Sequence, residues 1–298
     1  MKTLRTLLAA IGLSLLTACG GGGNDADGGD SGAPISGVIS GSVTKGPVRD
    51  ATVAAHGIEG GQMGAQLASA RTDADGNFTL SIGTHAGPVM LQVSAGSYTD
   101  EATGASMAMS PGDVMTAALP GVAVGAAHHG IQVTPLTAMA QAMAHRMAGG
   151  LTDANITAAN TAMGNYFSVA DILHVRPMNP LVAGAGASAG DDARNYGMTL
   201  AAMSHYALSQ NRVNSSSMVT AMMNDASDGV MDGKHGTDHI SMPMHGMMGG
   251  GRMAATAGTS GLATAMTDFM NSAANASGTT AAHMTELLHK LAHSDGHL

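Results

Sequence analysis

Short segments that alternate apolar with small polar residues fill residues 35–120 and predict β-strands. Such segments lie at 37–43, 52–55, 78–82 and 89–93, with turn residues between them. The stretch 72–77, TDADGN, separates two of the runs and predicts a hairpin turn in which Gly76 takes a positive φ. Several short strands at this spacing predict a small antiparallel β-sandwich.

After Pro120 the apolar positions recur with the period of a helix. Thr134 precedes Pro135 as an N-cap residue precedes proline in the first turn, and Leu136, Met139 and Met143 then share one face. Further helices are expected from residue 152 or 153 to about 167, and near 191–209, 216–226, 261–271 and 280–292. The pattern predicts an all-α helical domain at 121–298, so the chain as a whole is a mixed, multi-domain fold.

The N-terminus has the pattern of an export signal. Lys2 and Arg5 precede an apolar run at 7–16, LLAAIGLSLL, which is too short to span a bilayer as a helix. Residues 20–34, GGGGNDADGGDSGAP, contain no apolar residue larger than Ala and predict a flexible tether.

Leu16-Thr17-Ala18-Cys19 resembles the lipobox of bacterial lipoproteins. The resemblance implies cleavage of a signal peptide at 1–18, with diacylglycerol on the thiol of Cys19 and an acyl chain on its new amine. Gly20, where retained lipoproteins carry Asp, implies the outer membrane of a bacterial cell envelope. A non-lipidated signal peptide with a coincidental cysteine is the alternative.

Three segments at 41–55, 70–80 and 87–104 (GSVTKGPVRDATVAA, ARTDADGNFTL and GPVMLQVSAGSYTDEATG) resemble the carboxypeptidase regulatory-like, transthyretin/Ig-like repeat of exported bacterial proteins. The resemblance implies a β-sandwich over residues 35–120 in an extracytoplasmic setting. It implies no catalytic residue, because such repeats are usually accessory.

Composition narrows the function classes. The 298 residues include 25 Met but no Trp, 3 Phe, 4 Tyr and a single Cys, with a formal charge of −9. An acidic chain with few aromatic residues argues against nucleic-acid binding. One cysteine excludes a disulfide framework and a Cys-cluster metal site.

A Met- and His-rich loop at about 232–258 is the strongest candidate for chemistry. Thioethers and imidazoles suit Cu(I) or Ag(I), and the run resembles Met/His-rich segments of periplasmic copper-handling proteins. The alternative is a flexible loop that binds no metal, in a chain whose methionines serve to fill apolar space. The candidate ligands are His235, His239, Met242, Met244, His245, Met247 and Met248.

Other motifs favour structural interpretations. The acidic stretch 225–233 lacks the closing acidic residue of a calcium loop, so a turn is favoured. Residues 186–190 match G-x-S-x-G without a preceding strand, and Ser42 and Lys45 match S-x-x-K without companion motifs.

We therefore expect a lipid-anchored extracytoplasmic lipoprotein that acts as a non-catalytic binding or structural module. Its partners would be the membrane, through the anchor, and an unidentified protein or small ligand; no cofactor is expected. The alternative is a periplasmic Cu(I)/Ag(I)-binding or metal-resistance protein, whose cofactor would be Cu(I).

Overall fold

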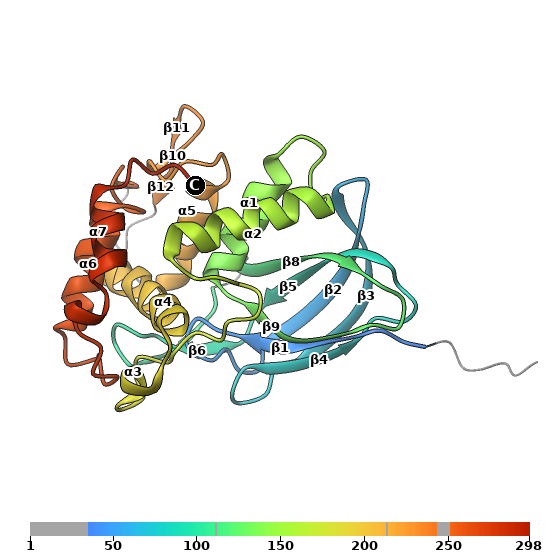
Figure 1. The fold of residues 1–298 in the computed structure, drawn as a ribbon, viewed down its shortest axis with the longest axis horizontal. Helices are drawn as coiled ribbons and strands as arrows, with labels where there is room; N and C mark the ends of the chain where they lie inside the picture. The colour runs from blue at the N-terminus through green and yellow to red at the C-terminus, as the bar shows by residue number, and fades with distance from the viewer. Residues whose placement is uncertain (1–34, 111, 213, 243–250) are drawn as a thin grey trace, which may run out of the picture. The chain divides into compact units, whose positions relative to one another are not determined.

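A computed structural model describes residues 35–110, 112–212, 214–242 and 251–298, and these described residues belong to one compact unit. Within the described part, strands in several sheets come first and a largely helical region with seven α-helices follows (Figure 1). The mixed fold class expected from the sequence is confirmed at this level.

Two sheets dominate the N-terminal part. One has the order β3-β2-β5-β8 and the other the order β4-β1-β9, while β6 and β7 form a separate pair. The strands are β1 (Val38–Val43), β2 (Thr52–Glu59), β3 (Gln62–Arg71), β4 (Asn77–Ser81), β5 (Gly87–Ser94), β6 (Ser97–Thr99), β7 (Ser106–Ala108), β8 (Val114–Val122) and β9 (Ala127–Val133).

The expectation of purely antiparallel sheets was wrong at one place, because β1 pairs in parallel with β9. Parallel neighbours need a long connection, and here the chain passes through the whole four-stranded sheet between the two strands. The prediction of an all-α region at 121–298 was also wrong in part: β8 ends at Val122, β9 follows, and four two-residue strands lie between residues 234 and 252.

A turn forms between β3 and β4 as predicted, but the expectation of a hairpin was wrong, because β3 pairs with β2 and β4 pairs with β1 in a different sheet. Gly76 has a φ of +80°, and the Asp73 carboxylate accepts hydrogen bonds from the backbone N–H groups of Asp75 and Asn77 at 2.9 and 2.8 Å. The hydrogen bonds from Asn77 hold the pKa of Asp73 below its usual range. This carboxylate therefore closes a turn.

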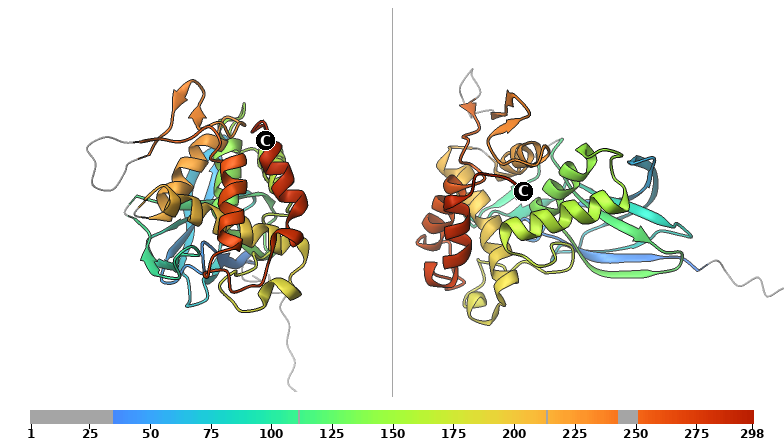
Figure 2. Two further views of the ribbon diagram at one scale, coloured as in Figure 1. Left: turned by 90° about the vertical axis from the view of Figure 1, so that its left-hand side faces the viewer. Right: turned by 45° about the horizontal axis from the view of Figure 1, so that its top comes forward.

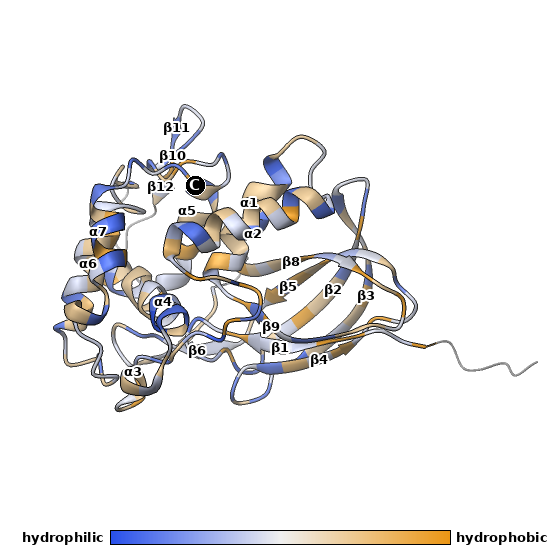
Figure 3. Cartoon of the chain, viewed as in Figure 1, coloured by the Kyte–Doolittle hydropathy of each residue, from blue (hydrophilic) through white to orange (hydrophobic). Residues whose placement is uncertain are grey.

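The helical region follows the predicted positions closely. The helices are α1 (Pro135–Arg146), α2 (Asp153–Phe167), α3 (Ala185–Ser188), α4 (Asp191–Ser209), α5 (Ser215–Ala226), α6 (Ser260–Met270) and α7 (Thr285–His293), with a 3₁₀ turn at Ala281–His283. Thr134 caps α1 through its hydroxyl, which accepts from the N–H of Thr137, and Pro135 stands in the first turn as predicted. Hydrophilic residues alternate with hydrophobic ones along α7, the pattern of a helix with one buried face (Figure 3).

Two apolar clusters organise the packing. One lies between the two sheets, and the other joins Ile58, Met90 and Ala118 of the four-stranded sheet to the helices. Helices α1 and α2 both contact β8, so they cover the face of this sheet that is turned away from β1, β4 and β9 (Figures 1 and 2). Buried methionines fill much of the helical cluster, where Phe and Trp are scarce: Met139, Met163, Met198, Met203, Met218, Met222 and Met266.

In the described ranges, every helix is too short or too polar to cross a bilayer.

Candidate functional site

A buried ion pair joins the strand-rich part to the helical region. Lys45 Nζ lies 2.7 Å from Glu101 Oε2, and both side chains are 2% exposed. The hydroxyl of Ser204, on α4, donates to the same Glu101 oxygen at 2.6 Å and also accepts from Lys45 Nζ. Three polar groups from distant parts of the chain therefore hydrogen-bond to one another in a buried place.

The tight turn after β1 positions Lys45. Thr44 and Pro47 form an isolated bridge across this turn, and Gly46 between them has a φ of +59°. A side chain on Gly46 would collide with the carbonyl oxygen of Thr99 at the end of β6. Only glycine lets the turn approach this strand so closely, and that approach places Lys45 next to Glu101.

Glu101 is positioned by its neighbour Asp100. The Asp100 Oδ1 atom accepts hydrogen bonds from the N–H groups of Ala102 and Thr103, both at 3.1 Å, which closes a turn between β6 and β7. Its other oxygen accepts from the hydroxyl of Ser215, the first residue of α5, at 2.6 Å. This turn therefore fixes the backbone on which Glu101 stands.

Helix α4 contributes Ser204 and one wall of the site. Gly197 lies seven residues before Ser204, close to two helical turns, so the two residues share a face. A Cβ atom on Gly197 would overlap the carbonyl oxygen of Met178, which shows that the segment 176–180 crosses the helix in direct contact. The absence of a side chain at Gly197 permits this crossing.

The charge of Lys45 is fixed by its surroundings. Burial alone lowers the pKa of this ammonium group, but the nearby carboxylates of Glu101 and Asp100 outweigh burial and raise the pKa above its ordinary value. The ring of Tyr98, whose centroid lies 5.3 Å from Nζ, also faces the charge. These surroundings therefore favour the protonated form of Lys45.

A cavity of about 200 Å³ lies beside this ion pair. The strand-rich part contributes Thr44, Gly46, Pro47, Asp75 and Glu101 to its lining, and the helical region contributes Arg176, Pro177, Met178, Asn179, Pro180, Gly197 and Leu200. Three prolines stiffen the walls, because each has a fixed φ. The cavity is smaller than the roughly 300–1,000 Å³ of pockets that hold drug-sized ligands, so it suits a smaller molecule.

Two lining residues keep unused hydrogen-bonding capacity. Glu101 uses Oε2 for Lys45 and Ser204, while Oε1 has no hydrogen-bond partner among the described residues. Arg176 is exposed, and within the same ranges its guanidinium forms no hydrogen bond or ion pair. The cavity thus offers a bound molecule an acceptor on a buried carboxylate and the N–H donors of the Arg176 guanidinium, whose charge also acts on the Asp73 carboxylate.

The structure describes three of the seven candidate metal ligands. His235 lies in β10 (Lys234–His235), His239 in β11 (Asp238–His239) and Met242 in β12 (Ser241–Met242), which pairs with β13 (Gly251–Arg252). Met244, His245, Met247 and Met248 lie outside the described residues, as does Cys19.

The two histidines are not brought together. His235 is paired with Asp238 and His239 with Lys234, and neighbouring positions of a strand point to opposite faces. His235 faces α5, where its Nδ1 atom lies 2.9 Å from the Ser227 hydroxyl, whereas Met242 is 3% exposed in the helical core. Among the described residues, no group of three or more His, Cys, Asp or Glu side chains is placed to hold a metal.

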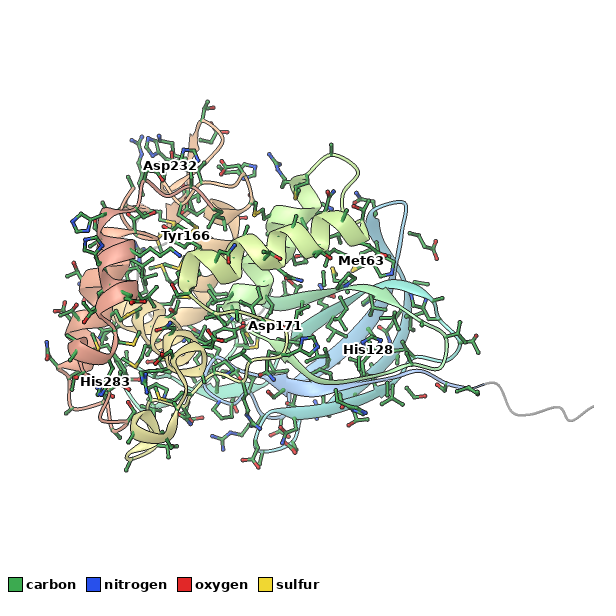
Figure 4. All side chains as sticks on the ribbon, in the orientation of Figure 1. Met63, His128, Tyr166, Asp171, Asp232 and His283 are labelled. Carbon is green, nitrogen blue, oxygen red and sulfur yellow. The ribbon has the colours of Figure 1, made fainter. Side chains whose placement is uncertain are left out.

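The acidic stretch 225–233 forms turns, in agreement with the interpretation favoured from the sequence. Asp225 is fully buried, and its Oδ1 accepts from the N–H groups of Asp232 and Gly233 at 3.0 and 2.7 Å. Its Oδ2 is buried without a hydrogen bond from any described residue, and burial raises the pKa of Asp225 to about 7. Asp232, labelled in Figure 4, marks this loop at the end of the unit away from the two main sheets.

The G-x-S-x-G match is not a nucleophile elbow. Ser188 is exposed in α3, a single short helix that no strand precedes, and its hydroxyl donates to the carbonyl of Ala185 in the same helix.

The cavity could not be identified from the sequence. Lys45 stands out there only as part of an S-x-x-K match, and neither Glu101 nor Ser204 belongs to a recognisable motif. One usable signal exists: Lys45 and Glu101 both stand in the segments that resemble the carboxypeptidase regulatory-like repeat, and such charges are expensive to bury unless they are paired.

Comparison with known proteins adds little. No protein-family model matches the chain, and no curated protein matches it either. Among solved structures, (S)-allantoin synthase is similar over 35% of this chain and 42% of its own, with 16% identity and a TM-score of 0.23. The similarity therefore spans less than half of that protein and supports no statement about fold or function.

Proposed function

We propose that this protein is a membrane-anchored extracytoplasmic lipoprotein that acts as a non-catalytic binding module, and that the cavity beside Lys45 and Glu101 is its ligand site. The observation that carries the proposal is the unused oxygen of Glu101. A carboxylate that is 2% exposed and half satisfied lines a cavity large enough for a small molecule. A ligand that donates to Oε1 would complete its hydrogen bonding.

The electrostatics of the site favour binding over catalysis. A serine and a lysine in contact can form a nucleophile and base, but that chemistry needs a neutral amine. The raised pKa favours the protonated form of Lys45, and two of its three N–H donors go to Glu101 and Ser204. The pair is suited to holding one carboxylate oxygen in place while the other meets a ligand.

The anchor and the fold complete the proposal. Cys19 in the lipobox-like sequence would carry the lipid, and the Gly- and Asp-rich residues 20–34 would link it to the folded unit. The two sheets around one apolar cluster support a β-sandwich of the carboxypeptidase regulatory-like kind. The first described strand, β1, begins at the end of the unit opposite α6 and α7 (Figure 1).

The anchor is tested by metabolic labelling with an alkyne-bearing fatty acid. We expect label on the wild-type protein in the membrane fraction and none on Cys19→Ala. No label on the wild type, or equal label on both proteins, would show that the anchor is wrong.

Binding is tested by thermal denaturation of the full-length lipoprotein in detergent. The probes are α-amino acids, glucose, succinate and putrescine, each at millimolar concentration. Thr44→Tyr puts a large side chain into the cavity, whereas Thr84→Tyr changes an exposed turn residue outside the cavity lining. We expect one class of probe to raise the melting temperature of the wild type and of Thr84→Tyr but not of Thr44→Tyr. If no probe has an effect, or if Thr44→Tyr responds like the wild type, the cavity is not a binding site.

A further inference from the structure

Hydrogen-bond acceptors line one wall of the cavity and N–H donors line the other. The strand-rich part supplies the carboxylates of Glu101 and Asp75. The segment 176–180 supplies N–H donors, namely the guanidinium of Arg176 and the amide of Asn179. Asn179 uses its Oδ1 to accept from the N–H of Leu181 at 3.0 Å, while its Nδ2 makes no hydrogen bond within the described ranges.

From this arrangement we propose that the ligand is a small zwitterion of the α-amino-acid type, with its ammonium group at Glu101 and its carboxylate at Arg176. The inference rests on the proposed binding function and names the chemical class of the ligand. An ammonium group is a donor without acceptor capacity, which suits the unused Glu101 oxygen. A carboxylate suits a guanidinium, because the two groups match in planar, bidentate geometry.

The remaining lining suits a molecule of this size. Pro47, Pro177, Pro180, Met178 and Leu200 supply apolar surface between the two polar walls. The volume of about 200 Å³ leaves room for the backbone of an amino acid and a modest side chain.

The experiment is isothermal titration calorimetry on the full-length lipoprotein with α-amino acids, their amides and their N-acetyl derivatives. The amide lacks the carboxylate and the N-acetyl form lacks the ammonium group, so each removes one charged contact. We expect at least one amino acid to bind, and both of its derivatives to bind at least about tenfold more weakly.

Variants assign the contacts. In Arg176→Gln the amino acid and its amide should bind with equal affinity, because the partner of the carboxylate is gone. Arg49→Gln is the matched control, since Arg49 is also exposed but does not line the cavity, and it should keep the tenfold preference. Arg176 is exposed, so its substitution is not expected to impair folding.

The outcomes separate the inference from the proposed function. If glucose, succinate or putrescine binds in a manner that Thr44→Tyr abolishes while no amino acid binds, the cavity is a binding site and the zwitterion is wrong. The same conclusion follows if the amide and N-acetyl forms bind as well as the parent amino acid. If no probe binds, both proposals fail.

Discussion

Replacing Asp225 by Asn is expected to change how the stability of the protein depends on pH. Asp225 is fully buried, and burial raises its pKa to about 7 from the ordinary 3.8. Because the folded state holds this proton more tightly than the unfolded state, the contribution to stability is complete below pH 3.8 and is lost as the pH rises through 7. A shift of about three pKa units corresponds to about 4 kcal/mol over this range.

Asparagine is a close mimic of the protonated acid at this position. Its amide oxygen can accept from the N–H groups of Asp232 and Gly233 as Asp225 Oδ1 does, and its amino group replaces an oxygen that has no partner among the described residues. The variant carries no titrating group there. The free energy of unfolding of Asp225→Asn, relative to wild type, should therefore increase by about 4 kcal/mol between pH 4 and pH 8.

Urea denaturation at several pH values measures this difference, with linear extrapolation to water at each pH. Asp228→Asn is the matched control, because Asp228 belongs to the same loop but is exposed, and it should keep the wild-type pH dependence. A difference between wild type and Asp225→Asn that stays constant from pH 4 to pH 8 would refute the assignment of the raised pKa to burial.

Three further predictions concern the ion pair, the cavity wall and the Met-rich loop. Lys45→Met leaves the Glu101 charge buried without its partner and should destabilise the protein by about 3–5 kcal/mol in urea denaturation. The double variant Lys45→Met, Glu101→Met should recover most of this loss. Equal losses in the single and double variants would argue against the ion pair. Gly197→Ala should push the Met178 carbonyl away from α4 and abolish ligand-induced thermal stabilisation, and a variant that still responds to the ligand would contradict this close packing. Met242→Leu should leave any Cu(I) affinity unchanged in competition titrations with a Cu(I) chelator, because this thioether is buried in the core; a weaker affinity would place Met242 among the ligands.

The helices could be predicted from the sequence because their signals are local. Thr134 and Pro135 mark the start of α1 through hydrogen bonds and a fixed φ that involve only neighbouring residues. The helix α4 was predicted from apolar positions one turn apart, and it begins and ends where the pattern does. Residues 72–77 likewise form their turn within a few residues of chain.

The sheet pairing and the cavity depend on contacts that no local pattern contains. Strand β9 pairs with β1 only after the intervening chain has completed the other sheet, so its parallel orientation is a tertiary property. Lys45 meets Glu101 at a separation of 56 residues and Ser204 at 159 residues. The sequence shows these polar residues, and only the fold shows that they satisfy one another.

The position of β1 has a mechanical consequence for an anchored protein. Tension on the lipidated Cys19 would enter the folded unit through this strand, because it is the first one after the tether. Strand β1 is hydrogen-bonded on both sides, to β4 and to β9, with five residue pairs on each side. A pull along its axis must shear two ladders at once, whereas an edge strand could be peeled away one bond at a time, so the proposed anchor would act on a strand that resists load.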